Sequence, residues 1–243
     1  AVFAGSGEAT ASVEAADGTV WVTGRSGDTG NMGLWHYDPY TGTFAENLWS
    51  NTLGGTGSIG FAVALAPSGT VLVAGRASVG AHPDAVLWAF SGGSFASPLG
   101  STGAYRDSAS ALALDGAGNA WLTGSTQDGA GNRDLAVWQS PAGYSALTLA
   151  ASYHDIAFTS TPYRNEGRGL VYSQGSLWAV GTLDNSLFAT WRYILNTGNL
   201  SGTLAYAAGF SALHNAAFYL SPTSSFQSPS TVVLAAPTAA SFA

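Results

Sequence analysis

Arginine and carboxylate side chains stand close together at four points of this 243-residue sequence. The pairs are Arg25 with Asp28, Arg106 with Asp107, Arg133 with Asp134, and Arg168 with Glu166. A guanidinium group can bind a carboxylate or a phosphate through two parallel hydrogen bonds. The pairs therefore allow two interpretations: either they hold loops in place, or they form a polar surface that binds a ligand.

Three carboxylates also suggest hydrolysis of a glycosidic bond. Glu8, Asp107 and Glu166 each lie near the beginning of a segment of small residues. Glycosidases use one carboxyl group as an acid and a second as a base or nucleophile. Because Arg106 and Arg168 stand beside two of these groups and argue against a protonated acid, hydrolysis remains the alternative to simple binding.

A glycine-rich loop offers oxygen ligands for a cation. Asp128, Asn132 and Asp134 place three side chains with oxygen ligands within seven residues, and calcium prefers oxygen ligands. Against a calcium site, Arg133 lies among them and the spacing is not that of an EF-hand. The four histidines are dispersed and there is no cysteine, so no zinc site is expected. We expect no cofactor, with calcium as the one possibility left open.

These residues are set among copies of one segment. Residues 19–25 form an alternating apolar run that ends with glycine and arginine, and similar runs occupy 70–76, 119–125 and 176–182, with a degenerate fifth at 231–237. The glycines Gly24, Gly75, Gly124 and Gly181 are 51, 49 and 57 residues apart. A tryptophan follows each glycine by 10 to 14 residues, at Trp35, Trp88, Trp138 and Trp191.

A repeat of about 50 residues with short strands and no helical period is typical of β-propeller blades. We therefore predict an all-β, single-domain propeller over 1–243 with five four-stranded blades, closed into a ring by the N-terminal strand 1–5. The alternative is a piece of a larger propeller. The predicted blades are 8–55, 59–104, 107–163, 166–209 and 211–243, the last completed by 1–5.

The repeated residues have predictable structural tasks. Tryptophans at Trp21, Trp121 and Trp178 and in the later strands are expected to fill the spaces between blades, since both faces of a blade are buried. Stacking on a sugar ring is the other possibility for these aromatic side chains. The glycine that ends each repeated segment is expected to let the chain turn steeply.

In a propeller, the loops after the second strand and the connections to the next blade share one face. Six of the seven arginines fall on that face by this rule, and only Arg192 does not. The opposite turns are rich in glycine, proline, serine and threonine. We expect a ligand to bind on the charged face, at Arg25, Asp28, Arg76, Arg106, Asp107, Arg133, Asp134, Arg168 and His214.

The segment 115–124, and next to it 17–24, resembles the unit of the bacterial secreted β-propeller repeat family (SBBP-like repeats). This resemblance covers about 8 to 195 and implies an exported propeller, with no catalytic residues to transfer. The family is usually described with seven blades and with tyrosine where this chain has tryptophan. Asp17 and Trp21 are also similar to the Asp box of sialidase-like propellers, although turn formation alone would account for an Asp-Gly pair there.

Composition limits the partners. The net charge is −7, only 9% of residues are charged, and every cation is arginine. Nucleic acid needs a basic surface and is not expected, and no apolar run is long enough for a spanning helix. The start without methionine and the small, weakly charged residues favour a secreted or cell-surface protein. We expect a monomer that binds a carbohydrate or an extracellular protein without catalysis; a purely structural surface module is a further alternative.

Overall fold

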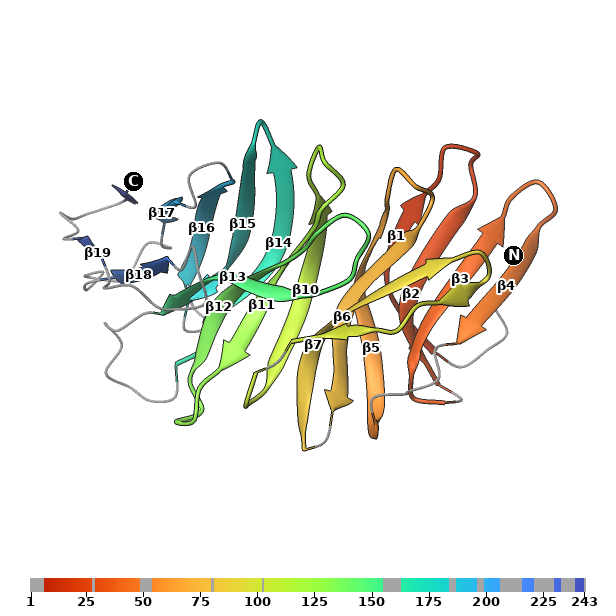
Figure 1. The fold of residues 1–243 in the computed structure, drawn as a ribbon, viewed down its shortest axis with the longest axis horizontal. Helices are drawn as coiled ribbons and strands as arrows, with labels where there is room; N and C mark the ends of the chain where they lie inside the picture. Colours follow the sequence, from red (N-terminus) through yellow and green to blue (C-terminus); the bar gives the residue numbers. More distant parts are fainter. Residues whose placement is uncertain are drawn as a thin grey trace.

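The computed structural model describes residues 7–27, 29–48, 54–79, 81–101, 103–154, 163–183, 187–195, 199–205, 216–220, 230–232 and 239–242. This part of the chain contains strands β1–β20 and no helix, and the strands form four antiparallel sheets. In Figure 1 the sheets follow one another in chain order, from the red strands at one end to the blue strands at the other. The prediction of an all-β fold built from successive four-stranded units is confirmed.

The first two sheets match the first two predicted repeats. The fourth strand of the second sheet is split into two short strands that both pair with β7, since Pro98 between them has no backbone N–H to donate. Sheet 1 contains β1 (Gly7–Glu14), β2 (Val20–Ser26), β3 (Met32–Asp38) and β4 (Thr43–Leu48). Sheet 2 contains β5 (Gly54–Leu65), β6 (Val71–Val79), β7 (His82–Ser91), β8 (Ser94–Phe95) and β9 (Leu99–Gly100).

The third and fourth sheets repeat this order, and the first strand of each sheet contacts the first strand of the next. Sheet 3 begins with β10 (Asp107–Leu114), β11 (Ala120–Gln127), β12 (Arg133–Ser140) and β13 (Thr148–His154). Sheet 4 begins with β14 (Glu166–Ser173), β15 (Ser176–Leu183), β16 (Leu187–Ile194) and β17 (Asn199–Ala205).

The predicted fifth blade is not confirmed. Strands β18 (Ala216–Leu220) and β19 (Ser230–Val232) extend the edge of sheet 3 beyond β13, and β20 (Ala239–Phe242) extends sheet 4 beyond β17. The N-terminal segment 1–5, which was expected to close the ring, lies outside the described residues. Ring closure therefore stays a prediction.

Alternating side chains of the central strands pack in opposite directions. In β6, Val71 and Val73 belong to the apolar cluster shared with Leu34 of sheet 1, whereas Leu72 and Ala74 belong to the cluster shared with sheet 3. A further cluster joins sheets 3 and 4. A strand buried on both faces can carry apolar residues on both sides, which explains the consecutive apolar residues within the repeated segment, such as those at 71–74.

Most of the tryptophans occupy these intersheet clusters, as predicted. Trp88, Trp121, Trp138 and Trp191 belong to them and are at most 4% exposed, and the partly buried Trp21 packs against the cluster between sheets 1 and 2. Trp35 is also 4% exposed but belongs to none of the three clusters. Trp178 is the exception, since 38% of its surface is exposed.

Each first strand carries a β-bulge at an equivalent place. The pairing register with the second strand slips by one residue, so that one residue has no partner. Such a bulge redirects the side chain of the extra residue. The extra residues are Thr10 in β1, Phe61 in β5, Ser110 in β10 and Arg168 in β14.

The repeated glycine lies opposite this bulge. Gly24, Gly75, Gly124 and Gly181 are in the middle of their strands, and their backbones are extended rather than turned, so the expected steep turn was wrong. A Cβ atom at these positions would overlap the carbonyl oxygens of Glu8, Ile59, Ser108 and Glu166, respectively. Glycine is needed here because the bulged strand presses its backbone against the second strand.

The residue before this glycine fits the next sheet. A Cβ atom at Gly60 of sheet 2 would collide with the hydroxyl of Thr23 in sheet 1. In the same way, a Cβ atom at Gly167 of sheet 4 would collide with the hydroxyl of Thr123 in sheet 3. Each threonine hydroxyl donates a hydrogen bond within its own sheet, at 3.1 Å to Gly33 and 2.9 Å to Ala136. Neighbouring sheets thus fit by pairing a larger residue with glycine.

Gly124→Ala is expected to destabilise the fold, because the new methyl group overlaps the backbone of β10. Overpacking of this kind costs about 1–3 kcal/mol in the free energy of unfolding. Gly100→Ala is the matched control, since a Cβ atom there meets nothing within 4 Å. Chemical denaturation measures both, and equal midpoints for the two variants would show that the bulge does not require glycine.

Candidate functional site

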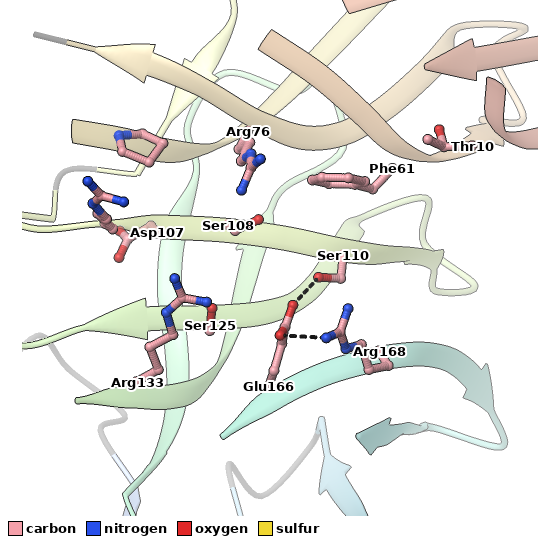
Figure 2. Close-up of a pocket in the computed structure, with 12 residues that line it drawn as sticks. Thr10, Phe61, Arg76, Asp107, Ser108, Ser110, Ser125, Arg133, Glu166 and Arg168 are labelled. Carbon is pink, nitrogen blue, oxygen red and sulfur yellow. Dashed lines mark hydrogen bonds and ion pairs between the residues drawn. The ribbon is translucent and has the colours of Figure 1, made fainter. Parts of the chain in front are cut away.

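The four bulge residues meet in one cavity of about 430 Å³. Thr10, Phe61, Ser110 and Arg168 come one from each sheet and all line it, together with residues at the ends of the second strands and the beginnings of the third. Figure 2 shows the aromatic ring of Phe61 between Thr10 and Arg76. The repeat therefore delivers one side chain from each sheet to the same place.

Arginine is the commonest charged residue of this cavity. Arg76, Arg106, Arg133 and Arg168 line it, against two carboxylates. Arg76 also lies over Phe61, with its guanidinium carbon 5.6 Å from the ring centroid, a cation–π arrangement. The cavity thus carries an excess of positive charge although the chain as a whole is acidic.

A second cavity of about 380 Å³ adjoins the first. Both are lined by Arg76, Pro83 and Arg106, and the second adds Arg25 and Ser58. The charged face that was predicted from the sequence is therefore hollowed from sheet 1 to sheet 4.

Glu166 is held by two neighbours. Its carboxylate forms an ion pair of 2.9 Å with the guanidinium of Arg168 and accepts a hydrogen bond of 3.2 Å from the hydroxyl of Ser110 (Figure 2). Ser110 belongs to sheet 3, so this carboxylate links two bulge positions across neighbouring sheets.

Asp107 is buried and hydrogen-bonded within the protein. Its side chain is 3% exposed and accepts hydrogen bonds from the hydroxyl groups of Ser101, at 2.6 Å, and Thr126, at 2.7 Å. The Ser101 hydroxyl oxygen also accepts the backbone N–H of Ala85 in β7. Asp107 therefore fastens the connection between sheets 2 and 3.

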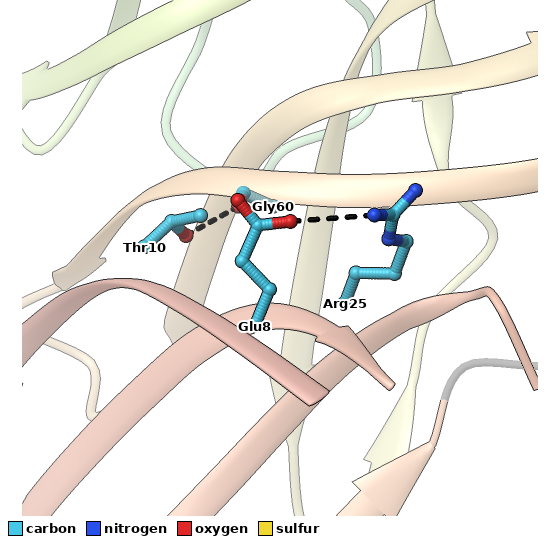
Figure 3. Close-up of polar contacts among 4 residues, drawn as sticks. All are labelled: Glu8, Thr10, Arg25 and Gly60. Atoms are coloured by element: carbon cyan, nitrogen blue, oxygen red, sulfur yellow. Dashed lines mark hydrogen bonds and ion pairs between the residues drawn. The ribbon is translucent and has the colours of Figure 1, made fainter. Parts of the chain in front are cut away.

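Glu8 lies apart from these two carboxylates. It forms an exposed ion pair of 3.4 Å with Arg25, and the hydroxyl of Thr10 donates a 2.6 Å hydrogen bond to the carbonyl of Gly60 (Figure 3). Among the described residues that line the first cavity, the carboxylates are Asp107 and Glu166. The three groups of the hydrolase alternative are not gathered around one cavity, and each is engaged by an arginine or by hydroxyl donors.

Among the described residues, a carboxyl group that the sequence did not single out has a strongly raised pKa. Asp84 in β7 is 8% exposed. Burial raises the pKa of Asp84 to about 6, and the negative charge of Asp107 adds to the increase. It follows Pro83, which lines both cavities, but no sequence signal distinguishes it from the other aspartates of the charged face.

The loop proposed for calcium is closed by its own hydrogen bonds. One oxygen of Asp128 accepts the backbone N–H groups of Ala130 and Asn132, and the other accepts the side-chain amide of Asn132 at 2.8 Å. Asp134 accepts the hydroxyl of Tyr163 at 3.1 Å. Over the ranges that the structure describes, no three histidine or acidic side chains group as metal ligands would. Asp17 likewise serves a turn, where it accepts the backbone N–H and the hydroxyl of Thr19.

The residues predicted to bind a ligand either line a cavity, lie away from both cavities, or fall outside the described residues. Arg76, Arg106, Asp107, Arg133 and Arg168 line the first cavity, and Arg25 lines the second. Asp134 lines neither cavity, and Asp28 and His214 lie outside the described residues. The distribution of charges gave no sign of the uncharged bulge residues Thr10, Phe61 and Ser110, although in the first four repeats one variable residue between two small residues marks this position.

No protein-family model matches the chain, and no characterised protein matches it in sequence. The structure is similar to a sialidase from Trypanosoma rangeli solved with the inhibitor DANA, with a TM-score of 0.51 and 11% identity over 76% of this chain and 36% of the sialidase. It is also similar to a protein of unknown function from Dyadobacter fermentans, with a TM-score of 0.53 and 10% identity over 95% of this chain and 83% of the other. This chain spans about a third of the sialidase. At such low identity the likeness shows the fold alone, which is propeller-like.

In the described part of the chain, no helix has the length and apolar character that crossing a membrane requires.

Asp84→Asn is expected to flatten the pH dependence of stability. Between the unfolded pKa of 3.8 and the folded value of about 6, the folded protein keeps a proton that the unfolded chain has released. The contribution of Asp84 to the free energy of unfolding should therefore fall by about 1–2 kcal/mol as the pH rises from 4 to 7, after allowance for partial solvent screening.

Asparagine resembles the protonated carboxyl group and cannot ionise, so the variant should lack this decrease. Denaturation at a series of pH values measures it, with Glu14→Gln as a control for the loss of one exposed negative charge. Parallel curves for Asp84→Asn and the wild type would contradict the assignment.

Proposed function

We propose that this protein binds a carbohydrate, without catalysis, in the cavity of its charged face. The convergence of one bulge residue from each of four sheets on a single cavity carries the proposal. Its volume of about 430 Å³ falls in the range of small-ligand sites, roughly 300–1,000 Å³. A hollow face favours a carbohydrate over an extracellular protein, the other partner expected from the sequence.

The lining suits a sugar. Phe61 offers an apolar ring against which a sugar face can pack, and Thr10, Ser108, Ser110 and Ser125 offer hydroxyl groups around it. Sugar hydroxyls both donate and accept hydrogen bonds, and this lining contains partners for both. Binding is favoured over hydrolysis because Asp107 and Glu166 are already engaged by neighbours within the protein.

A ligand that binds only the folded protein raises its melting temperature. We expect at least one member of a panel of mono- and oligosaccharides to do so, and Phe61→Ala to weaken that binding about tenfold, or ~1.4 kcal/mol. Tyr40→Ser is the control, since Tyr40 is an exposed aromatic residue on the opposite turns. If no saccharide shifts the melting temperature, or if Phe61→Ala binds as the wild type does, carbohydrate binding is wrong. The same screen with calcium and with a chelator tests the calcium loop.

We also propose that residues 211–243, completed by 1–5, form a fifth sheet over the outer face of sheet 4, in place of the edge positions on sheets 3 and 4 that β18–β20 take in the structure. Trp178 occupies the position of Trp121 in the preceding repeat, and Trp121 is 4% exposed because sheet 4 packs against it. The cross-strand neighbour of Trp178, Val171, is 57% exposed. These two side chains are apolar, as in a strand with another sheet on either side.

Trp178→Ser and Trp121→Ser distinguish the arrangements. If a fifth sheet covers Trp178, both substitutions should cost about 3–5 kcal/mol in unfolding free energy, as expected for loss of a buried tryptophan. A cost for Trp178→Ser below ~1 kcal/mol, together with a large cost for Trp121→Ser, would show that the face stays open.

We further propose that the protein acts outside the cell and belongs with the secreted β-propeller repeats. The small, weakly charged residues and the repeat unit support this. Fractionation of cells that produce the protein tests the location, and recovery in the cytoplasm alone would contradict it.

A further inference from the structure

We infer that the two adjoining cavities form one groove for an acidic oligosaccharide, whose sugar carboxylates are bound by the arginines. This inference rests on the proposed carbohydrate binding and adds the charge and the length of the ligand. Five arginines of the charged face line the groove, and they are Arg25, Arg76, Arg106, Arg133 and Arg168.

Three of these arginines have no carboxylate partner among the described residues. Arg25 pairs with Glu8 and Arg168 pairs with Glu166. In the part of the chain that the structure describes, Arg76, Arg106 and Arg133 form no ion pair. A guanidinium group binds a carboxylate most strongly through two parallel hydrogen bonds, and these three groups are available for that purpose.

The position of the unpaired arginines sets the ligand's length. Arg76 and Arg106 line both cavities and so lie where the two meet, whereas Arg133 lines the first cavity alone. The volumes of about 430 Å³ and 380 Å³ each suit a small ligand. A chain of two or more acidic sugar residues can therefore place one carboxylate at the junction and another within the first cavity.

The stacking of Arg76 on Phe61 holds the guanidinium of Arg76 in place where the two cavities meet. The ring holds the guanidinium 5.6 Å from its centroid, which restricts its movement before a ligand arrives. The same ring is open to the first cavity, so one sugar residue can pack on Phe61 while its carboxylate reaches Arg76.

The lining favours an acidic sugar over inorganic phosphate or an acidic peptide. Asp107 and Glu166 would repel a multiply charged phosphate, whereas the partly exposed carboxylate of Glu166 can accept a hydrogen bond from a sugar hydroxyl. Ser108, Ser110 and Ser125 also offer hydroxyl groups, which can bind the hydroxyls of a sugar but would have no partner on the side chains of an acidic peptide. A uronate chain matches both the cations and the hydroxyl-rich remainder.

Titration calorimetry on the whole chain tests the inference. The probes are trigalacturonate and trimannuronate, which differ in linkage, their neutral methyl esters, and the corresponding monosaccharides. We expect at least one acidic trisaccharide to bind at least about tenfold more tightly than its ester and its monomer. Its affinity should decrease as the salt concentration rises from 50 mM to about 300 mM.

The variants Arg76→Gln and Arg106→Gln should each weaken binding of the acidic trisaccharide about tenfold and bring it closer to the ester. Arg192→Gln is the matched control, because Arg192 is outside the groove and stacks on Trp178, with its guanidinium carbon 5.3 Å from the ring centroid. Melting temperatures check that each variant is folded. Equal weakening by Arg192→Gln would overturn the assignment of the groove.

The outcomes separate this inference from the proposed function. If neutral esters bind as tightly as the acids, or monomers as tightly as trimers, the acidic groove is wrong and carbohydrate binding stands. If inorganic phosphate or hexaglutamate binds as tightly as the acidic trisaccharides, the groove is a general anion site and the inference fails. If no saccharide binds, both proposals fail.

Discussion

The contact between each bulged first strand and the glycine of its neighbour controls where the functional side chains lie. The bulge brings the carbonyl group of one strand against the other, and the glycine leaves room for it. The same irregularity turns Thr10, Phe61, Ser110 and Arg168 into the cavity. A regular ladder would have kept strict alternation and sent these side chains toward a neighbouring sheet. The irregularity is thus the means by which a packed repeat gains a binding surface.

Packing and binding make separate demands on the repeat. The second and third strands supply the tryptophans and aliphatic side chains that fill the space between sheets, and they do so in every copy. The extra residue of the first strand takes no part in the ladder, so its identity is free to differ from sheet to sheet. Threonine, phenylalanine, serine and arginine at one position are compatible with a site whose chemistry is set independently of the scaffold.

Electrostatics also differs between the scaffold and the groove. The chain is acidic overall, but its arginines are concentrated along the hollowed face. Asp107 accepts hydrogen bonds from neighbouring hydroxyl groups, Glu166 forms an ion pair with an arginine, and Asp84 is buried beside Asp107. Positive charge from the unpaired arginines therefore remains for a ligand in a molecule that would otherwise repel anions.

The local pattern of the sequence determined the all-β fold, the repeated four-stranded unit and the burial of its tryptophans, because alternation and turn residues act over short distances. It also placed most arginines on one face. Only the tertiary structure decided that Phe61 and Ser110 share a cavity with Arg76, since a bulge depends on how two strands pair. Only the tertiary structure buried Asp84 near Asp107, since their proximity joins sheet 2 to sheet 3. The conserved place of the glycine in the repeated segment could be recognised in the sequence. The reason for glycine there could not, because it depends on the backbone of the bulged first strand, which packs against it.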